Sequence, residues 1–113
     1  VRVAATAVTP PFVLAGDLVT APGPGGPPQV KIFRGTQIAS QGALFTGTGA
    51  QDRLADFFDG DRNDLSGRFV AAADYTADGT VDVAVGTGAG VPARVTVYNG
   101  SPIRTQGLSF TGN

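Results

Sequence analysis

The sequence contains no cysteine, histidine, methionine, tryptophan or glutamate, and its only lysine is Lys31. Without cysteine and histidine there is no disulfide, no thiol nucleophile, no zinc finger and no imidazole acid–base catalyst. The missing glutamate and methionine, together with the near absence of lysine, remove most residues that favour helices. We therefore exclude a helical bundle and the enzyme classes that depend on Ser-His-Asp or Cys-His groups.

Charge and hydrophobicity exclude two further classes. Eight basic residues against nine acidic ones give a net charge of −1, which offers no basic surface to a nucleic acid. No apolar run approaches the ~20 residues that a membrane-spanning helix needs. The chain has 113 residues with 17 glycines and 8 prolines, a composition typical of one small domain rich in strands and turns.

The chain repeats itself at a spacing of 65 residues. Asp17–Thr48 aligns with Asp82–Asn113 without a gap, and 12 of the 32 aligned positions are identical. Upstream the spacing becomes 67, so that Val3–Ala5 aligns with Val70–Ala72. An internal duplication of this size predicts two stacked supersecondary units.

Each unit is predicted to form four short antiparallel strands, with no helix longer than about two turns. The units span residues 1–48 and 68–113, and residues 49–67 connect them. Within this connector, Leu54–Phe58 is expected to form a short helical turn or an extra strand. The predicted strands are Val1–Ala7, Val13–Thr20, Gln29–Arg34 and Ile38–Thr46 in the first unit, and Arg68–Ala73, Val81–Gly86, Arg94–Tyr98 and Ile103–Phe110 in the second.

Aromatic residues divide into two groups by their predicted positions. Strand and repeat-equivalent positions predict packing in the core, whereas loop positions predict exposure. The first group is Phe33, Phe45, Phe69, Tyr98 and Phe110, and the second is Phe12, Phe57, Phe58 and Tyr75.

The segment Val70–Gly86, with the sequence VAAADYTADGTVDVAVG, resembles the FG-GAP or integrin α-type β-propeller repeat. The downstream turn and strand, Gly86–Gly100, resemble bacterial, planctomycete-like members of that family. The resemblance implies an all-β fold of two four-stranded antiparallel propeller blades. It also implies a non-enzymatic protein located outside the cell, on its surface or in the periplasm.

The loop of this motif predicts a calcium site. Asp74, Thr76, Asp78 and Asp82 occupy positions 1, 3, 5 and 9, and Gly79 permits a sharp turn at position 6. Oxygen ligands at alternating positions suit Ca²⁺, and the backbone carbonyl of Thr80 would supply position 7. The alternative is a hydrogen-bonded turn that holds no ion.

Two other loops are not expected to bind a cation. The loop Thr9–Asp17 in the first unit retains only Asp17 of the acidic set. The acidic run Asp56–Asp64 has a less specific spacing, and Arg62 interrupts it. A solvated turn is therefore the preferred interpretation of this run.

Two blades bury only the faces between them, and each outer face needs a partner. We expect further blades of a longer propeller or a ring of several copies of the chain to cover those faces. The predicted function is a scaffold for assembly and for binding a protein or glycan, with a sugar-binding lectin as the alternative. The candidate ligand-binding residues are Tyr75, Arg94, Asp59 and Asp61.

Overall fold

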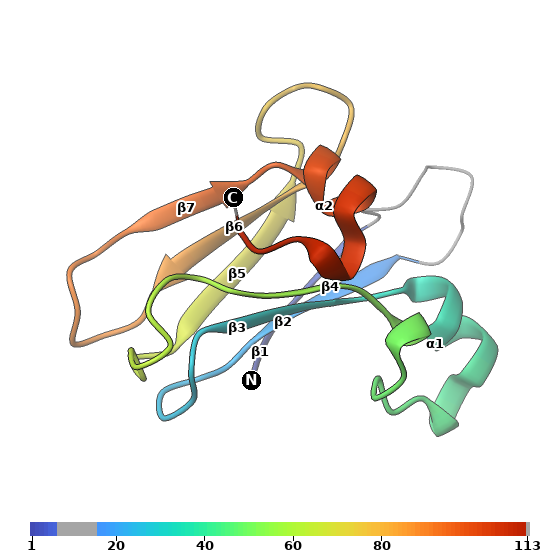
Figure 1. The fold of residues 1–113 in the computed structure, drawn as a ribbon, viewed down its shortest axis with the longest axis horizontal. Helices are drawn as coiled ribbons and strands as arrows, with labels where there is room; N and C mark the ends of the chain where they lie inside the picture. The colour runs from blue at the N-terminus through green and yellow to red at the C-terminus, as the bar shows by residue number, and fades with distance from the viewer. Residues whose placement is uncertain (7–15, 113) are drawn as a thin grey trace.

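The computed structural model describes residues 1–6 and 16–112, and it confirms a mostly β fold built of two antiparallel sheets (Figure 1). Strand order in the first sheet is β1-β2-β3-β4, and in the second it is β5-β6-β7. The strands are β1 (Arg2–Thr6), β2 (Asp17–Ala21), β3 (Gln29–Phe33), β4 (Arg53–Phe58), β5 (Arg68–Ala73), β6 (Asp82–Thr87) and β7 (Val95–Tyr98).

The last predicted strand of each unit is wrong, because both segments are helical. The region predicted as strand Ile38–Thr46 forms α1 (Gly35–Gln41) and a 3-10 turn, η1 (Gly42–Leu44). Likewise, the region predicted as Ile103–Phe110 forms α2 (Gly100–Gln106) and η3 (Gly107–Ser109). Both helices have seven residues, which agrees with the two-turn limit. Each is followed by a glycine at a φ of 57°, a left-handed conformation that ends the helix.

The first sheet takes its fourth strand from the segment expected to be a connector. Strand β4 lies within residues 49–67 and pairs antiparallel with β3, with Gln29 opposite Phe58 and Ile32 opposite Ala55. A short 3-10 turn, η2 (Ala50–Asp52), leads into it. Among the described residues the second sheet has three strands rather than the predicted four.

The two sheets face each other across one shared core. The inner face of the first sheet presents Val19, Val30 and Ile32, all fully buried, together with Phe57. The inner face of the second sheet presents Val83 and Val85, also fully buried, and Tyr98. Strand β1 lies against β5, which brings the first strand of each unit together.

Aromatic rings close the core at the end where α2 lies. Phe57, predicted to be exposed, is buried and packs edge-on against Tyr98 and Phe110, with centroids 4.9 Å from each. Because β4 pairs with β3, Phe57 lies on the inner face of the first sheet. Phe69, predicted to lie in the core, is 54% exposed, and the Arg2 guanidinium lies 3.6 Å from its ring centroid. Its side chain belongs to the outer face of β5.

Many identities of the internal repeat have a structural cause. Phe33 and Phe45 meet edge-on at 5.9 Å, and their equivalents Tyr98 and Phe110 do so at 6.2 Å. The glycine pairs at 25 and 90, at 42 and 107, and at 47 and 112 all have positive φ. None of the described helices is long and apolar enough to cross a membrane.

Candidate functional site

The acidic loop that follows β5 gathers three carboxylates. One oxygen from each of Asp74, Asp78 and Asp82 lies within 4.8 Å of the others. Two residues with positive φ, Ala77 at 59° and Gly79 at 82°, curl the loop so that these side chains converge. Asp74 and Asp78 are exposed and Asp82 is buried, so the group is open to solvent on one side.

Hydrogen bonds within this loop already hold the carboxylates in place. Asp74 accepts from the backbone N–H groups of Asp78 and Gly79, at 3.2 and 2.8 Å. Thr76 donates both its N–H and its hydroxyl to Asp82, each at 3.0 Å. These bonds are those of a turn, and they also orient three carboxylates toward one another as a Ca²⁺ site requires.

Asp82 ties the acidic loop to helix α2. Its second oxygen accepts the backbone N–H of Gly100 at 2.8 Å, so the side chain satisfies an N–H at the start of the helix. Burial alone would raise the pKa of Asp82. The hydrogen bonds from Gly100, Thr76 and Tyr75 have the larger combined effect, so the pKa lies below its usual value. Asp82 is therefore ionised at neutral pH.

The first unit repeats this arrangement at its own helix. Asp17 is buried and accepts the backbone N–H of Gly35, the first residue of α1, at 2.8 Å. The aspartate shared by the two repeats therefore has a structural role in both units. The prediction that the loop Thr9–Asp17 binds no ion concerns residues that, apart from Gly16 and Asp17, lie outside the described part of the chain.

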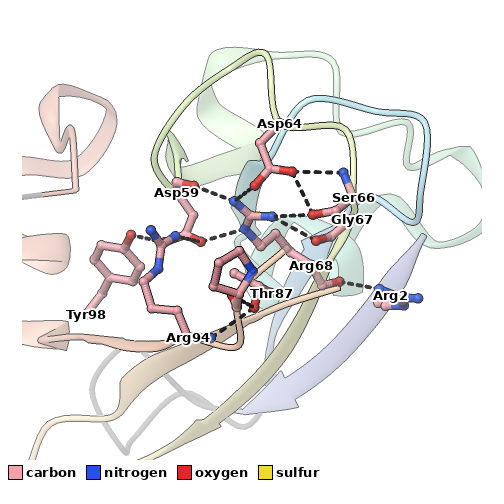
Figure 2. Close-up of polar contacts among 10 residues, drawn as sticks. Arg2, Asp59, Asp64, Ser66, Gly67, Arg68, Thr87, Arg94 and Tyr98 are labelled. Carbon is pink, nitrogen blue, oxygen red and sulfur yellow. Dashed lines mark hydrogen bonds and ion pairs between the residues drawn. The ribbon is translucent and has the colours of Figure 1, made fainter. Parts of the chain in front are cut away.

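A second polar cluster lies between the two units, centred on the buried Arg68 (Figure 2). Its guanidinium donates to Asp59 at 2.6 Å and to Asp64 at 2.9 Å. Asp59, which is 1% exposed, also accepts from Arg94 at 3.0 Å and from the hydroxyl of Tyr98. The carboxylate of Asp59 thus joins the connector to β5 and to β7.

The charges of this cluster are firmly set at neutral pH. Burial by itself lowers the pKa of Arg68, but its bonds to Asp59 and Asp64 raise it above the usual value. Burial also raises the pKa of Tyr98, and its bond to Asp59 raises it further. Arg68 is therefore a cation and Tyr98 a neutral hydrogen-bond donor at neutral pH.

Arg68 is absent from the candidate site residues predicted from the sequence. A signal was present, because an arginine opens a strand that is otherwise wholly apolar, and aspartates precede it by four and nine residues. A buried arginine requires such partners, since an unpaired charge in a protein interior is strongly unfavourable.

Acid should weaken this cluster through Asp64. Hydrogen bonds from the Ser66 side chain, from the Ser66 backbone N–H and from Arg68 lower the pKa of Asp64 from 3.8 to about 2. Because the pKa is lower in the folded state, the ionised carboxylate stabilises the fold above about pH 4, and this contribution is lost as the pH falls toward 2. We expect Asp64→Asn to flatten the dependence of the urea midpoint on pH in that window.

A matched variant checks the cause of this shift. Ser66→Ala removes the largest contribution and should move the acid-sensitive window to higher pH. An unchanged pH profile in both variants would contradict the assignment to Asp64.

A groove of about 600 Å³ opens beside the Arg68 cluster, between the connector and the β6–β7 turn. Arg94 and Asp61 both line it, so two of the predicted ligand-binding residues lie together. Its wall is completed by Asn63, Asp64, Leu65, Ser66, Thr87, Ala89, Gly90, Val91 and Pro92. Asp59 is not among the lining residues; it is buried and paired with Arg94.

Tyr75 does not join these residues. It follows Ala73, which pairs with Asp82 at one end of β6, whereas Arg94 precedes Val95, which pairs with Gly86 near the other end. Four residue steps along β6 separate Asp82 from Gly86, roughly 13 Å at ~3.3 Å per step. Tyr75 therefore belongs to the acidic-loop end of the second sheet.

Comparison with known proteins adds no relative to this description. No family model matches the chain, and the searches of curated proteins and of solved structures found no match.

Proposed function

We propose that the chain is a pair of stacked propeller-type blades that serves as a non-enzymatic binding and assembly scaffold outside the cell, with one calcium-stabilised loop. The observation that carries the proposal is the way in which the two repeats pack. When the two repeats are aligned, positions on the inner face of the first sheet match positions on the outer face of the second. Val19 and Ile32 of the first sheet correspond to Ala84 and Val97 of the second, which lie on its opposite, outer face.

Packing of this kind is head to tail. One face of the first repeat covers the opposite face of the second, so the same contact can be made again by a further unit. A symmetrical sandwich would pack the same face of both repeats together, and no further unit could then be added through the same contact. Head-to-tail stacking of similar sheets is the principle of a β-propeller, and it supports the blade assignment.

The calcium site proposed for this scaffold uses Asp74, Asp78 and Asp82, with Thr80 supplying a backbone carbonyl. The hydroxyl of Thr76 donates to Asp82, so it supports the site rather than adding a ligand. Calcium bound here would offset two of the three negative charges of these carboxylates and would brace the connection between β5 and β6. Through Asp82 this connection also fixes the start of α2.

Calcium should therefore raise the melting temperature of the protein relative to a chelator. Asp78→Ala should abolish this rise, because it removes an exposed carboxylate whose loss leaves the core intact. Asp61→Ala is the matched control and should keep it. The rise should also shrink as the pH falls into the range in which carboxylates take up protons. Identical melting in calcium and in chelator would show that the loop is only a turn.

Sugar binding is the second candidate function, and the groove beside Arg94 and Asp61 favours it. A guanidinium and a carboxylate that line one groove can bind hydroxyl groups of a sugar, the first as donor and the second as acceptor. No aromatic residue is among those that line the groove. A glycan array on the intact protein tests this candidate.

A further inference from the structure

The outer face of the second sheet is an exposed apolar surface. We define it by Phe69 and Ala71 on β5, Ala84 and Gly86 on β6, and Val95 and Val97 on β7. These residues form two complete rows across the strands, and none of them is polar. Phe69 is 54% exposed, Val95 72% and Val97 46%. Exposed apolar patches of this kind mark interaction surfaces.

The corresponding face of the first sheet shows how such a surface is covered. At the 65-residue spacing, Val30 and Ile32 correspond to Val95 and Val97. The first pair is 0% exposed because the inner face of the second sheet lies over it. The same positions are thus buried in one repeat and open in the other, and the difference is the presence of a covering unit.

The chain itself contains the counterpart of the covering surface. The inner face of the second sheet includes Val70, Val83, Val85 and Tyr98, and these correspond to Val3, Leu18, Thr20 and Phe33 of the first sheet. Those four residues share the outer face of the first sheet, and Val3 is 56% exposed. They have the same order across the strands, and three of the four are apolar. The same two rows continue into Lys31, Asp56 and Arg53, so this face also carries charged side chains along β3 and β4.

We propose that the outer face of the second sheet binds the outer face of the first sheet of another copy of this chain. This proposal rests on the head-to-tail stacking argued above, which it extends from within the chain to between chains. The outer face of the first sheet has Lys31 where the inner face of the second sheet has Thr96, and Thr20 where the second has Val85. The contact between copies is therefore more polar than the contact within the chain. We expect it to be the weaker of the two, so that copies associate only at high protein concentration.

Sedimentation velocity tests the proposal on the intact chain. The sedimentation coefficient should rise between micromolar and near-millimolar concentration. Val97→Asp should hold the protein as a monomer throughout that range without lowering its melting temperature at low concentration. Leu65→Asp is the matched control, because Leu65 is equally exposed, at 50%, but lies in the connector loop; it should associate as the wild type does.

A mixing experiment distinguishes head-to-tail contact from contact between identical faces. Val3→Asp damages the other proposed surface and should also give a monomer. An equimolar mixture of the Val3→Asp and Val97→Asp proteins should form a one-to-one complex, because each keeps the surface that the other has lost. Wild-type protein that stays monomeric, or Val3→Asp protein that associates as the wild type does, would overturn the proposal.

An inner-face variant separates this outcome from failure of the proposed function. Val83 is 0% exposed and lies between the two sheets, so Val83→Asp should unfold the chain even where it is monomeric. If Val83→Asp melts as the wild type does, the stacking of the two repeats is itself wrong. If it unfolds while the wild type stays monomeric, the stacking stands and only self-association is refuted.

Discussion

Asp59→Ala should lower the free energy of unfolding by about 3–5 kcal/mol, the usual cost of removing one partner from a buried ion pair. Asp59 is 1% exposed and accepts hydrogen bonds from Arg68, Arg94 and Tyr98. Its loss leaves the equally buried Arg68 with only Asp64 to balance its charge, and it leaves the Tyr98 hydroxyl without this acceptor. The effect is large because Arg68 and Tyr98 are buried and cannot turn to water in place of Asp59.

Urea denaturation measures this effect, and Asp61→Ala provides the control. Asp61 lies on the same connector and is exposed, so its replacement should change the free energy of unfolding by less than about 0.5 kcal/mol. Similar midpoints for the two variants would show that the buried cluster contributes little. Asp59→Asn, which keeps the shape and loses the charge, should fall between the control and Asp59→Ala.

Gly100→Ala should cost about 3 kcal/mol or more, because the added methyl group has no space. A Cβ at this position would lie 1.8 Å from the carbonyl oxygen of Val81 and 2.9 Å from a methyl of Thr80. The first obstacle is backbone, so a side-chain rotation cannot relieve it. The helix would have to move away from the strand, which would also break the hydrogen bond from Gly100 to Asp82.

Gly23→Ala is the matched control for this substitution. The nearest atom to a Cβ at Gly23 is the Val1 nitrogen at 3.9 Å, an ordinary contact distance. We expect its midpoint in thermal or urea unfolding to remain close to that of the wild type. If Gly100→Ala is equally mild, the close approach of α2 to the start of β6 is wrong.

The two helices show where prediction from sequence failed. Ile38–Thr46 and Ile103–Phe110 carry apolar residues at spacings that fit a short strand as well as a helix, and periodicity over so few residues does not separate the two. The first N–H of α2 bonds to Asp82, which lies 18 residues earlier in the chain. That bond exists only once β6 and the helix are brought together, so local preference alone does not reveal it.

For strand β4 the local sequence leaves two alternatives open. Leu54–Phe58 fits a short helical turn or an extra strand, and its pairing with β3 decides in favour of the strand. The paired residues lie 20 to 29 positions apart, because α1 and the turns that follow it separate the two strands. Because pairing between distant segments determines a strand at a sheet edge, the sequence of the segment by itself is ambiguous.

Composition and short-range spacing are local properties of the chain, and they are enough to predict several features. These are the mostly β class, the exclusion of thiol and imidazole chemistry, the duplication, and the grouping of Asp74, Asp78 and Asp82. Three other features appear only when the chain is folded: Arg68 is buried against Asp59, Tyr75 lies apart from Arg94, and one repeat covers the opposite face of the other. Each of these depends on which distant segments meet, and the free energy of such contacts comes from burial and pairing across the whole fold.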